Sequence, residues 1–332
     1  MASIIDDLQK PNSLPDPTET VFFIQTHISM VFVADNFVYK VKKPVDFGFL
    51  DFSTIEKRKH FCNQEIVLNS RFSNSIYLSV LPVRFNGKVH FLGEGRGEVV
   101  DYAVKMKRIP DFALMKSFFE RDELNEGHLG AIARAIAGFH EKALQSKEID
   151  NFGDPDVFKF TTDENFEQTE KYIGITISGN SYNILKQWTD RFFQKNRDLF
   201  YKRISLKRIK DCHGDLHMEH ICLSDPVSMI DCIEFNDRLR YTDTLADIGF
   251  LLMDLEYRGG KGFADVLWEK YSRIAKEDRM EPMLTFYKIY RAYVRGKINS
   301  FQVDDLQITM DKKEIANNTA KKYFKLALGY IQ

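Results

Sequence analysis

The stretch that decides the fold is residues 211–254, which read DCHGDLHMEHICLSDPVSMIDCIEFNDRLRYTDTLADIGFLLMD. Three of the chain's eight histidines lie in its first ten residues, around Asp215. A mainly apolar run follows and ends on Asp231. The dipeptide Asp225-Pro226 indicates a turn before that run, because the residue before a proline is disfavoured in the helical region. The pattern predicts a loop that carries Asp215, then a hairpin and a strand that ends on Asp231.

Two carboxylates brought together by a hairpin repel each other unless a positive charge lies between them. A divalent cation is the simplest such charge. Phosphoryl transfer needs this combination, with one carboxylate to orient and deprotonate a hydroxyl and another to hold magnesium on the phosphates. The stretch is therefore a candidate phosphotransfer site.

An ordered set of residues in this stretch resembles the aminoglycoside phosphotransferase and choline kinase group: His213-Gly214-Asp215-Leu216-His217, Ile230-Asp231, Asp243 and Asp247. These are small-molecule kinases with a protein-kinase-like fold. The resemblance implies an α+β, two-lobe architecture, with an antiparallel-sheet N-lobe that holds one helix and a mainly helical C-lobe. It also implies ATP and Mg²⁺ as cofactors, with Mn²⁺ as the alternative ion, and a small-molecule hydroxyl acceptor.

The resemblance assigns roles to the residues of the motif. Asp215 is the expected catalytic base, with His213 beside it, and Asp231 is the expected main metal ligand. The family's loop runs His-Gly-Asp-x-x-x-x-Asn, and this chain has His220 at the asparagine position. We expect His220 to take over the metal-binding function of that asparagine.

Two further aspartates match structural positions of the family. By resemblance, Asp243 caps the helix that follows the motif, and Asp247 anchors the catalytic loop from that helix. Three residues near Asp231, namely Glu234, Arg238 and Arg240, are candidates for contact with the acceptor. If the two arginines face the substrate, they favour an anionic acceptor such as a sugar acid or a phosphorylated metabolite.

The first ~107 residues show the pattern of an antiparallel sheet with one helix. Residues 1–18 contain several prolines and read as an arm, 19–107 as the N-lobe, and 108–332 as the C-lobe. Strands are expected near residues 21–25, 29–34, 37–41, 77–83, 88–92 and 99–106, and a helix within 51–68. Helical spacing recurs at 129–144, 263–276, 282–301 and 311–330, with further helices in 154–200.

The family places a lysine on the third strand and pairs it with a glutamate on the helix. Lys40 and Glu65 match these positions. Lys42 points to the same face of the strand, since side chains alternate with period two, and it is the rival candidate. We expect only one of the two lysines to meet Glu65 and the phosphates.

The turn between the first two strands lacks the glycine-rich sequence that holds phosphates in this family. Backbone amides and the hydroxyls of Thr26 and Ser29 are the expected substitutes. The resemblance places the adenine ring against the segment 107–112 that joins the lobes, with Met106 and Arg108 as nearby contacts.

Composition excludes several classes of protein. A net charge of −1 over 332 residues argues against general binding to nucleic acid or to a membrane surface. The longest apolar runs are too short for a membrane span, and the N-terminus lacks the features of a signal peptide. The four cysteines form no Cys-x-x-Cys pair, which favours buried reduced thiols in a cytoplasmic protein. No partner protein is indicated.

Two alternative functions remain open. The histidines at 213, 217 and 220, together with Asp215 and Asp231, are able to bind zinc or manganese and activate water, as in a metal-dependent hydrolase. Their spacing matches no known zinc motif, and this interpretation gives Lys40 and Glu65 no function. A non-catalytic nucleotide-binding module is the second alternative, because the glycine-rich loop is missing. Tightly bound zinc favours the hydrolase, whereas ATP hydrolysis accelerated by a hydroxyl compound favours the kinase.

Overall fold

A computed structural model describes residues 3–73, 75–305 and 308–331 of the chain. The chain folds into two compact units. Unit 1 consists of Met1–Asp122 and Glu219–Asp237, and unit 2 consists of Glu123–Met218 and Arg238–Gln332. Each unit is thus built from two separate stretches of sequence.

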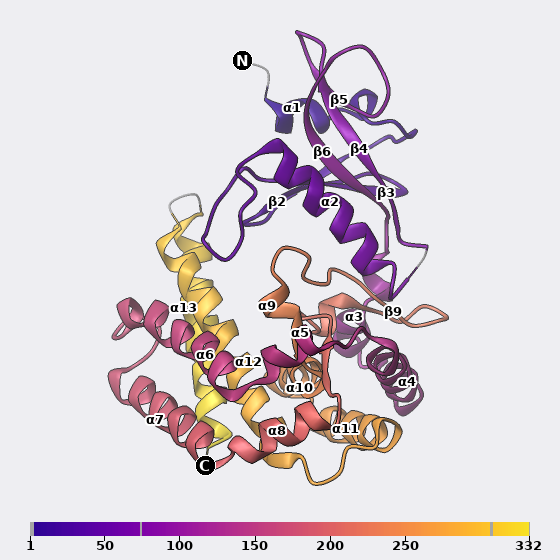
Figure 1. Cartoon of the computed structure of the whole chain (residues 1–332). Helices are drawn as coiled ribbons and strands as arrows, with labels where there is room; N and C mark the ends of the chain where they lie inside the picture. Colours follow the sequence, from indigo (N-terminus) through magenta and orange to yellow (C-terminus); the bar gives the residue numbers. More distant parts are fainter. Residues whose placement is uncertain (1–2, 74, 306–307, 332) are drawn as a thin grey trace. The chain divides into compact units, whose positions relative to one another are not determined.

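Unit 1 is organised around a six-stranded antiparallel sheet in the order β1-β2-β3-β6-β4-β5 (Figure 1). Asn86-Gly87, a sequence typical of hairpin turns, lies between the strand that ends at Phe85 and the strand that begins at His90. The strands are β1 (Phe22–Gln25), β2 (Ser29–Val33), β3 (Phe37–Lys42), β4 (Tyr77–Phe85), β5 (His90–Leu92) and β6 (Glu98–Lys107).

Helix α2 (Ile55–Asn69) covers part of one face of this sheet (Figure 1). It begins after Thr54, whose hydroxyl accepts a hydrogen bond from the backbone N of Lys57 at 3.3 Å, as an N-cap residue does. Its buried side packs Cys62 against Val104 of β6. Helix α2 packs on β4 and β6, and its Glu65 side chain reaches Lys40 and Lys42 of β3.

The opposite face of the sheet is covered by the N-terminal segment. Helix α1 (Ile4–Leu8) and a 3₁₀ turn (Pro11–Ser13) pack there, with Leu8 and Leu14 buried against Phe32 and Tyr39. The Asp7 carboxylate accepts a hydrogen bond from the backbone N of His90 at 2.9 Å. The N-terminal segment, which we expected to be an arm, is therefore part of the core of unit 1.

The second stretch of unit 1 forms a short hairpin of β8 (Ile221–Cys222) and β9 (Ser228–Met229). The predicted strand before Asp231 is only two residues long, and Asp231 follows it with a backbone φ of +59°. The first stretch of unit 1 ends with a 3₁₀ turn at Asp111–Ala113 and α3 (Met115–Glu120).

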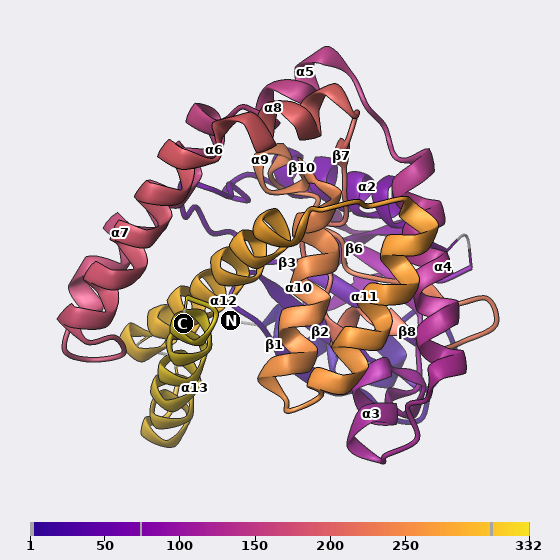
Figure 2. The ribbon, with the colours of Figure 1, turned by 90° about the horizontal axis from the view of Figure 1, so that it is seen from below.

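Unit 2 is mainly helical, with a two-stranded antiparallel ladder of β7 (Ile209–Asp211) and β10 (Tyr241–Asp243). In Figure 2, α10 lies between α11 and α12, and α13 packs on α12. The helices are α4 (Glu126–Lys142), α5 (Lys147–Asp150), α6 (Pro155–Thr169), α7 (Gly179–Lys195), α8 (Arg197–Ser205), α10 (Thr244–Tyr257), α11 (Lys261–Ala275), α12 (Glu281–Asp304) and α13 (Met310–Gly329), while α9 (Asp237–Arg240) starts on the last residue of unit 1.

Tight packing of α12 on α13 explains a glycine in the middle of a long helix. A Cβ atom on Gly296 would lie 2.7 Å from the Phe324 ring, which is closer than side chains approach. No helix in the described part of the chain is long and apolar enough to cross a membrane.

Candidate active site

Both lysines of β3 reach the same glutamate. The Nζ atom of Lys40 donates to Oε1 of Glu65 at 3.0 Å, and Nζ of Lys42 donates to Oε2 of Glu65 at 2.7 Å. Lys40 and Lys42 are two residues apart on one strand and therefore point to one face, where α2 presents Glu65. The expectation that only one of the lysines can meet Glu65 is therefore wrong.

Each lysine has a second carboxylate partner from the hairpin segment of unit 1. Lys40 donates to Oδ1 of Asp231 at 2.7 Å, and Lys42 donates to Glu234. Glu65, Lys42 and Glu234 are buried, so any contact between Glu234 and an acceptor would require its pair with Lys42 to open. We refer to these five residues as the Lys–acid cluster.

Burial and charge act in opposite directions on the pKa values of the cluster. Burial lowers the pKa of Lys40, but the charges of Asp231 and Glu65 outweigh it and raise this pKa well above its ordinary value. Burial likewise works to raise the pKa of Glu65, and the two lysines nevertheless hold it below its ordinary value. For Glu234 burial prevails over Lys42, and its pKa is raised. Burial also works to lower the pKa of Lys42, but the charges of Glu234 and Glu65 outweigh it and raise this pKa. The acidic partners therefore favour the charged form of both lysines.

The solvent-accessible end of the cluster is the Lys40–Asp231 pair. The Asp231 side chain is 44% exposed, whereas that of Lys42 is fully buried. The backbone N of Asp231 donates to the Tyr77 hydroxyl at 2.9 Å, and the next residue, Cys232, donates through its N to Asn69 at 3.0 Å. Strand β4 and helix α2 thus fix the position of Asp231, and its left-handed backbone suits an aspartate better than most residues.

Asp231 and His220 together offer a partial metal site. The Nε2 atom of His220 lies 3.7 Å from Oδ2 of Asp231, the oxygen that Lys40 does not bind. One carboxylate oxygen and one imidazole nitrogen fit a divalent ion whose other ligands are phosphate oxygens and water, and imidazole suits Mn²⁺ better than Mg²⁺. The residues present therefore fit the metal that the resemblance implies.

An apolar strip continues the Lys40 face of the sheet. In the strand register, Ile24 pairs with Val31 and Val31 with Lys40. The side chains of Phe22 and Ile24 are 60% and 53% exposed although they are large and hydrophobic. Exposed apolar side chains beside a lysine suit the flat, apolar faces of an adenine ring whose phosphates carry negative charge. Sequence analysis missed this strip, although the alternation of residues along β1 carried the signal.

The remaining residues expected to contact the nucleotide occupy different environments. Thr26 is exposed, and its hydroxyl accepts a hydrogen bond from the backbone N of Ser29 at 2.9 Å within the β1–β2 turn. Ser29 itself is fully buried, so its hydroxyl cannot reach a phosphate in this conformation. Met106 pairs with Val38 on the face of the apolar strip. Arg108 donates to the backbone carbonyl of Ala34.

In unit 2, the Asp247 side chain holds the His-Gly-Asp loop by hydrogen bonds to the backbone of that loop. Its carboxylate accepts from the N of His213 at 2.7 Å and from the N of Gly214 at 2.9 Å. Gly214 has φ +83°, which a side chain would strain, and its carbonyl accepts from Arg291 Nη1 at 2.8 Å. Burial works to raise the pKa of Asp247, but the hydrogen bond and charge of His140 and nearby cations hold it below its ordinary value.

This anchoring leaves Asp215 accessible at the tip of the loop. Its side chain is 35% exposed, and Oδ2 lies 3.6 Å from Nε2 of His217. His213 is buried, and its Nδ1 accepts from the backbone N of Asp215 at 3.3 Å, so it supports the loop. The loop thus presents one half-exposed carboxylate on a backbone fixed by Asp247.

The other residues near the motif form ion pairs within unit 2. Asp243 caps α10 by accepting from the N of Leu245 at 2.9 Å, and it also binds Arg203 at 2.6 Å. Arg240 is buried and donates to Asp211 at 2.5 Å. Arg240 is thereby engaged inside unit 2 in this structure, away from solvent.

Several solved structures align with nearly the whole chain. An amicoumacin kinase in complex with AMP-PNP and Ca²⁺ gives a TM-score of 0.54 at 14% identity and covers 95% of this chain and 89% of its own. A choline kinase from Streptococcus pneumoniae gives 0.51 at 14% identity, covering 93% and 94%. The GDP complex of aminoglycoside 2′-phosphotransferase-IIIa gives 0.52 at 11% identity, covering 94% of both chains. The chain has a protein-kinase-like fold. This confirms the predicted fold class.

A family comparison gives a conflicting result. Residues 81–237 match the family model described as Peptidase family M54. A zinc peptidase of the His-Glu-x-x-His type needs two histidines four residues apart on a helix. His140-Glu141 begins that pattern, but Leu144 stands at the position of the second histidine, and no other histidine in the sequence precedes a glutamate. The match covers less than half of the chain and does not assign it to a peptidase family.

Curated relatives come from mycobacteria. Uncharacterized proteins of Mycobacterium tuberculosis (strain ATCC 25618 / H37Rv) and Mycobacterium bovis are 32% identical to this chain over 309 residues. The match covers 93% of this chain and 59% of each relative. The chain thus spans about three fifths of the length of the curated relatives it matches, and their descriptions name no activity.

Proposed function

We propose that the protein transfers the γ-phosphate of ATP to a hydroxyl group of a small molecule. The observation that carries this proposal is the Lys–acid cluster at the end of an exposed apolar strip on one face of the sheet. Lys40 would bind the α- and β-phosphates, while Glu65 keeps it in position, and the adenine would lie against Phe22 and Ile24. This arrangement gives each part of ATP a chemically suitable surface within unit 1.

The second requirement is a group that activates the acceptor. Asp215 would accept the hydrogen bond and then the proton of the acceptor hydroxyl. Its loop is fixed by Asp247, so the carboxylate would meet the substrate with little loss of freedom. Asp231, the residue proposed to hold the metal, follows Asp215 by sixteen positions in the sequence.

A divalent ion at Asp231 and His220 would neutralise the charge that develops on the transferred phosphoryl group. Lys40 pairs with Asp231 in this structure. Binding of the ion would free the Lys40 ammonium for the phosphates. The structure therefore supports a site in which one lysine serves the carboxylate and the phosphates in turn.

We propose that Lys297 of unit 2 contacts an anionic acceptor. The Lys297 ammonium donates to the amide oxygens of Asn165 at 2.6 Å and Gln168 at 2.7 Å, which are neutral partners. Burial lowers the pKa of Lys297 to about 8, and the charge of Arg238 adds to this against the opposing charge of Glu164. An ammonium that burial destabilises in this way would gain from a bound anion.

An ATP-consumption screen tests the proposed function. The native protein with Mg²⁺ or Mn²⁺ is assayed against sugars, sugar acids, phosphorylated sugars, amino alcohols and nucleosides. We expect at least one hydroxyl compound to accelerate ATP consumption and to appear as its phosphate ester in mass spectrometry. Slow ATP hydrolysis that no hydroxyl compound accelerates would contradict the proposal.

The match to a peptidase family makes a metal-dependent hydrolase the second candidate. This activity would proceed without ATP. Peptide cleavage by the native protein in nucleotide-free buffer, abolished by a chelator and insensitive to replacement of Lys40, would favour the hydrolase.

Replacement of His220 by asparagine is expected to shift the metal preference. If His220 binds the ion, the native protein should favour Mn²⁺ over Mg²⁺ more strongly than His220→Asn does, because the amide oxygen of asparagine suits Mg²⁺. The ratio of ATP turnover with the two ions measures this. Asp231→Asn is the reference for loss of the site and should lose metal-dependent ATP affinity. An identical ratio in native protein and His220→Asn would show that Asp231 holds the metal without His220.

The anionic acceptor predicts a pH dependence. Raising the pH through about 8 should deprotonate Lys297, so the KM for the acceptor should rise over this range. The KM for ATP should stay constant over the same range. Lys297→Met should show a high acceptor KM at every pH, without this pH dependence. Lys312→Met, at an exposed position of α13, is the control. An acceptor KM that is the same in Lys297→Met and native protein would separate Lys297 from the acceptor and leave the phosphotransfer proposal intact.

A further inference from the structure

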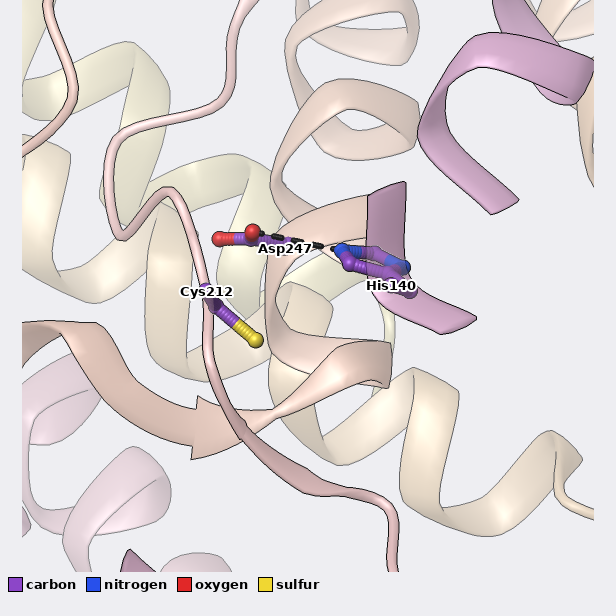
Figure 3. Close-up of side chains that lie close together, drawn as sticks. All are labelled: His140, Cys212 and Asp247. Atoms are coloured by element: carbon purple, nitrogen blue, oxygen red, sulfur yellow. Dashed lines mark hydrogen bonds and ion pairs between the residues drawn. The ribbon is translucent and has the colours of Figure 1, made fainter. Parts of the chain in front are cut away.

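A second group of potential metal ligands lies in the interior of unit 2 (Figure 3). It consists of His140 near the end of α4, Cys212 directly after β7, and Asp247 on α10. All three are buried, and their ligand atoms lie within 4.8 Å of one another. Imidazole nitrogen, thiolate sulfur and carboxylate oxygen are the donor types that bind zinc in proteins.

The spacing of His140 and Asp247 suits two ligands of one ion. Their Nε2 and Oδ2 atoms are 3.3 Å apart, whereas a charge-assisted hydrogen bond is about 2.7–2.9 Å long. Two ligand atoms each about 2.0–2.1 Å from a tetrahedral zinc ion are separated by about 3.3–3.4 Å. In this structure the contact is a long hydrogen bond (Figure 3), and its length equals the separation of two neighbouring zinc ligands.

The surroundings already supply the outer contacts that metal ligands need. A histidine that binds a metal usually donates its other ring N–H to a hydrogen-bond acceptor. The Tyr271 hydroxyl lies 2.8 Å from Nδ1 of His140 and can accept that bond. The backbone N of His213 donates to Oδ2 of Asp247 and that of Gly214 donates to Oδ1, which orients the carboxylate and leaves one lone pair on Oδ2 for an ion.

We propose that His140, Cys212 and Asp247 bind one structural divalent ion of the zinc class. On binding, the Cys212 thiol loses its proton to solvent, and the imidazole proton of His140 resides on Nδ1, where it bonds Tyr271. The Thr242 carbonyl, which accepts from Cys212 Sγ at 3.4 Å, is a nearby oxygen for the fourth position. The thiolate and the carboxylate together neutralise the charge of the ion.

The ion would join three segments that meet at the catalytic loop. Cys212 immediately precedes His213, and Asp247 holds the backbone of the loop. A bound ion would therefore stabilise the loop from its buried side. Its ligands differ from Asp231 and His220, which we propose to hold the catalytic metal. Because all three ligands are buried, we expect the ion to enter while the chain folds. The inference does not depend on the proposed phosphotransfer.

Cobalt-substituted protein provides the test. The full chain is produced in minimal medium with Co²⁺ in place of Zn²⁺, and its absorption spectrum and cobalt content are measured. We expect one ion per chain and a thiolate-to-Co²⁺ charge-transfer band. This band requires a sulfur ligand, so a metal held only by histidines and aspartates would not produce it. Native protein without the band would overturn the proposal whatever the variants do.

Variants locate the ion. Cys212→Ser should lose the band, while Cys222→Ser, which replaces another buried thiol, should keep it. If Cys212→Ser does not fold, His140→Gln serves in its place because it removes a different ligand. Zn²⁺ present during refolding should raise the Tm of native protein and Cys222→Ser and leave that of the ligand variants unchanged. A band that persists in both ligand variants, or one lost in Cys222→Ser, would contradict the site.

Discussion

Asp215→Asn is expected to reduce the rate of phosphotransfer by at least about 100-fold, the usual range for loss of a general base, while ATP affinity changes little. The substitution keeps the shape of the side chain and removes its ability to accept a proton. ATP affinity should persist because the residues proposed to bind ATP form a network within unit 1. Turnover in a coupled assay and titration calorimetry with Mg²⁺ and ATP measure the two quantities.

Asp198→Asn, an exposed change on α8 with the same loss of charge, is the matched control and should keep native turnover. Full activity in Asp215→Asn would remove Asp215 from the mechanism. Loss of both activity and ATP binding, together with a lower Tm, would instead assign Asp215 a structural function.

Lys42→Met is expected to destabilise the folded protein by about 3–5 kcal/mol, the usual cost of removing one partner from a buried ion pair. Lys42 is fully buried between Glu65 and Glu234, so its loss leaves two carboxylates without their shared cation. Lys40→Met should have the opposite profile, with a smaller loss of stability and a larger loss of ATP use, since Lys40 is the lysine at the accessible end. Chemical denaturation ranks the two variants by the free energy of unfolding, and ATP kinetics rank them by activity.

The double variant Lys42→Met/Glu234→Gln separates charge from packing. Removing the orphaned carboxylate should recover part of the lost stability, so the double variant should be more stable than the sum of the single effects implies. Strict additivity would show that Lys42 contributes by packing alone. If Lys42→Met impairs ATP use more than Lys40→Met at equal stability, the phosphate-binding lysine lies two residues further along β3.

Local periodicity was sufficient to predict the sheet of unit 1 and the face of its lysines. Alternation along β3 places Lys40 and Lys42 on one side whatever the rest of the chain does. The resemblance, not a local pattern, implied that Asp247 anchors the His-Gly-Asp loop, and its carboxylate accepts from the backbone N atoms of His213 and Gly214. The directions of the two lysines depend on residues of one strand, where the period determines which way a side chain points.

Long-range pairs could not be predicted in the same way. The bond from Lys42 to Glu234 joins residues 192 positions apart, and no local signal specifies it. The prolines before residue 18 favoured an arm because their backbone cannot continue a helix or strand, yet Leu8 and Leu14 find a hydrophobic surface that only the folded sheet creates. Burial of Arg240 similarly follows from the Asp211 carboxylate, 29 residues away.

The discontinuous composition of unit 1 has a consequence for dissecting the protein genetically. A truncation after Asp122 would remove residues 219–237 and with them Asp231 and Glu234, so Lys40 and Lys42 would be left to share Glu65. It would also expose the apolar surface that Ile230 covers. A fragment that contains all of unit 1 should therefore join residues 1–122 to residues 219–237 through a flexible linker. Co-expression of these two stretches as separate chains is the alternative.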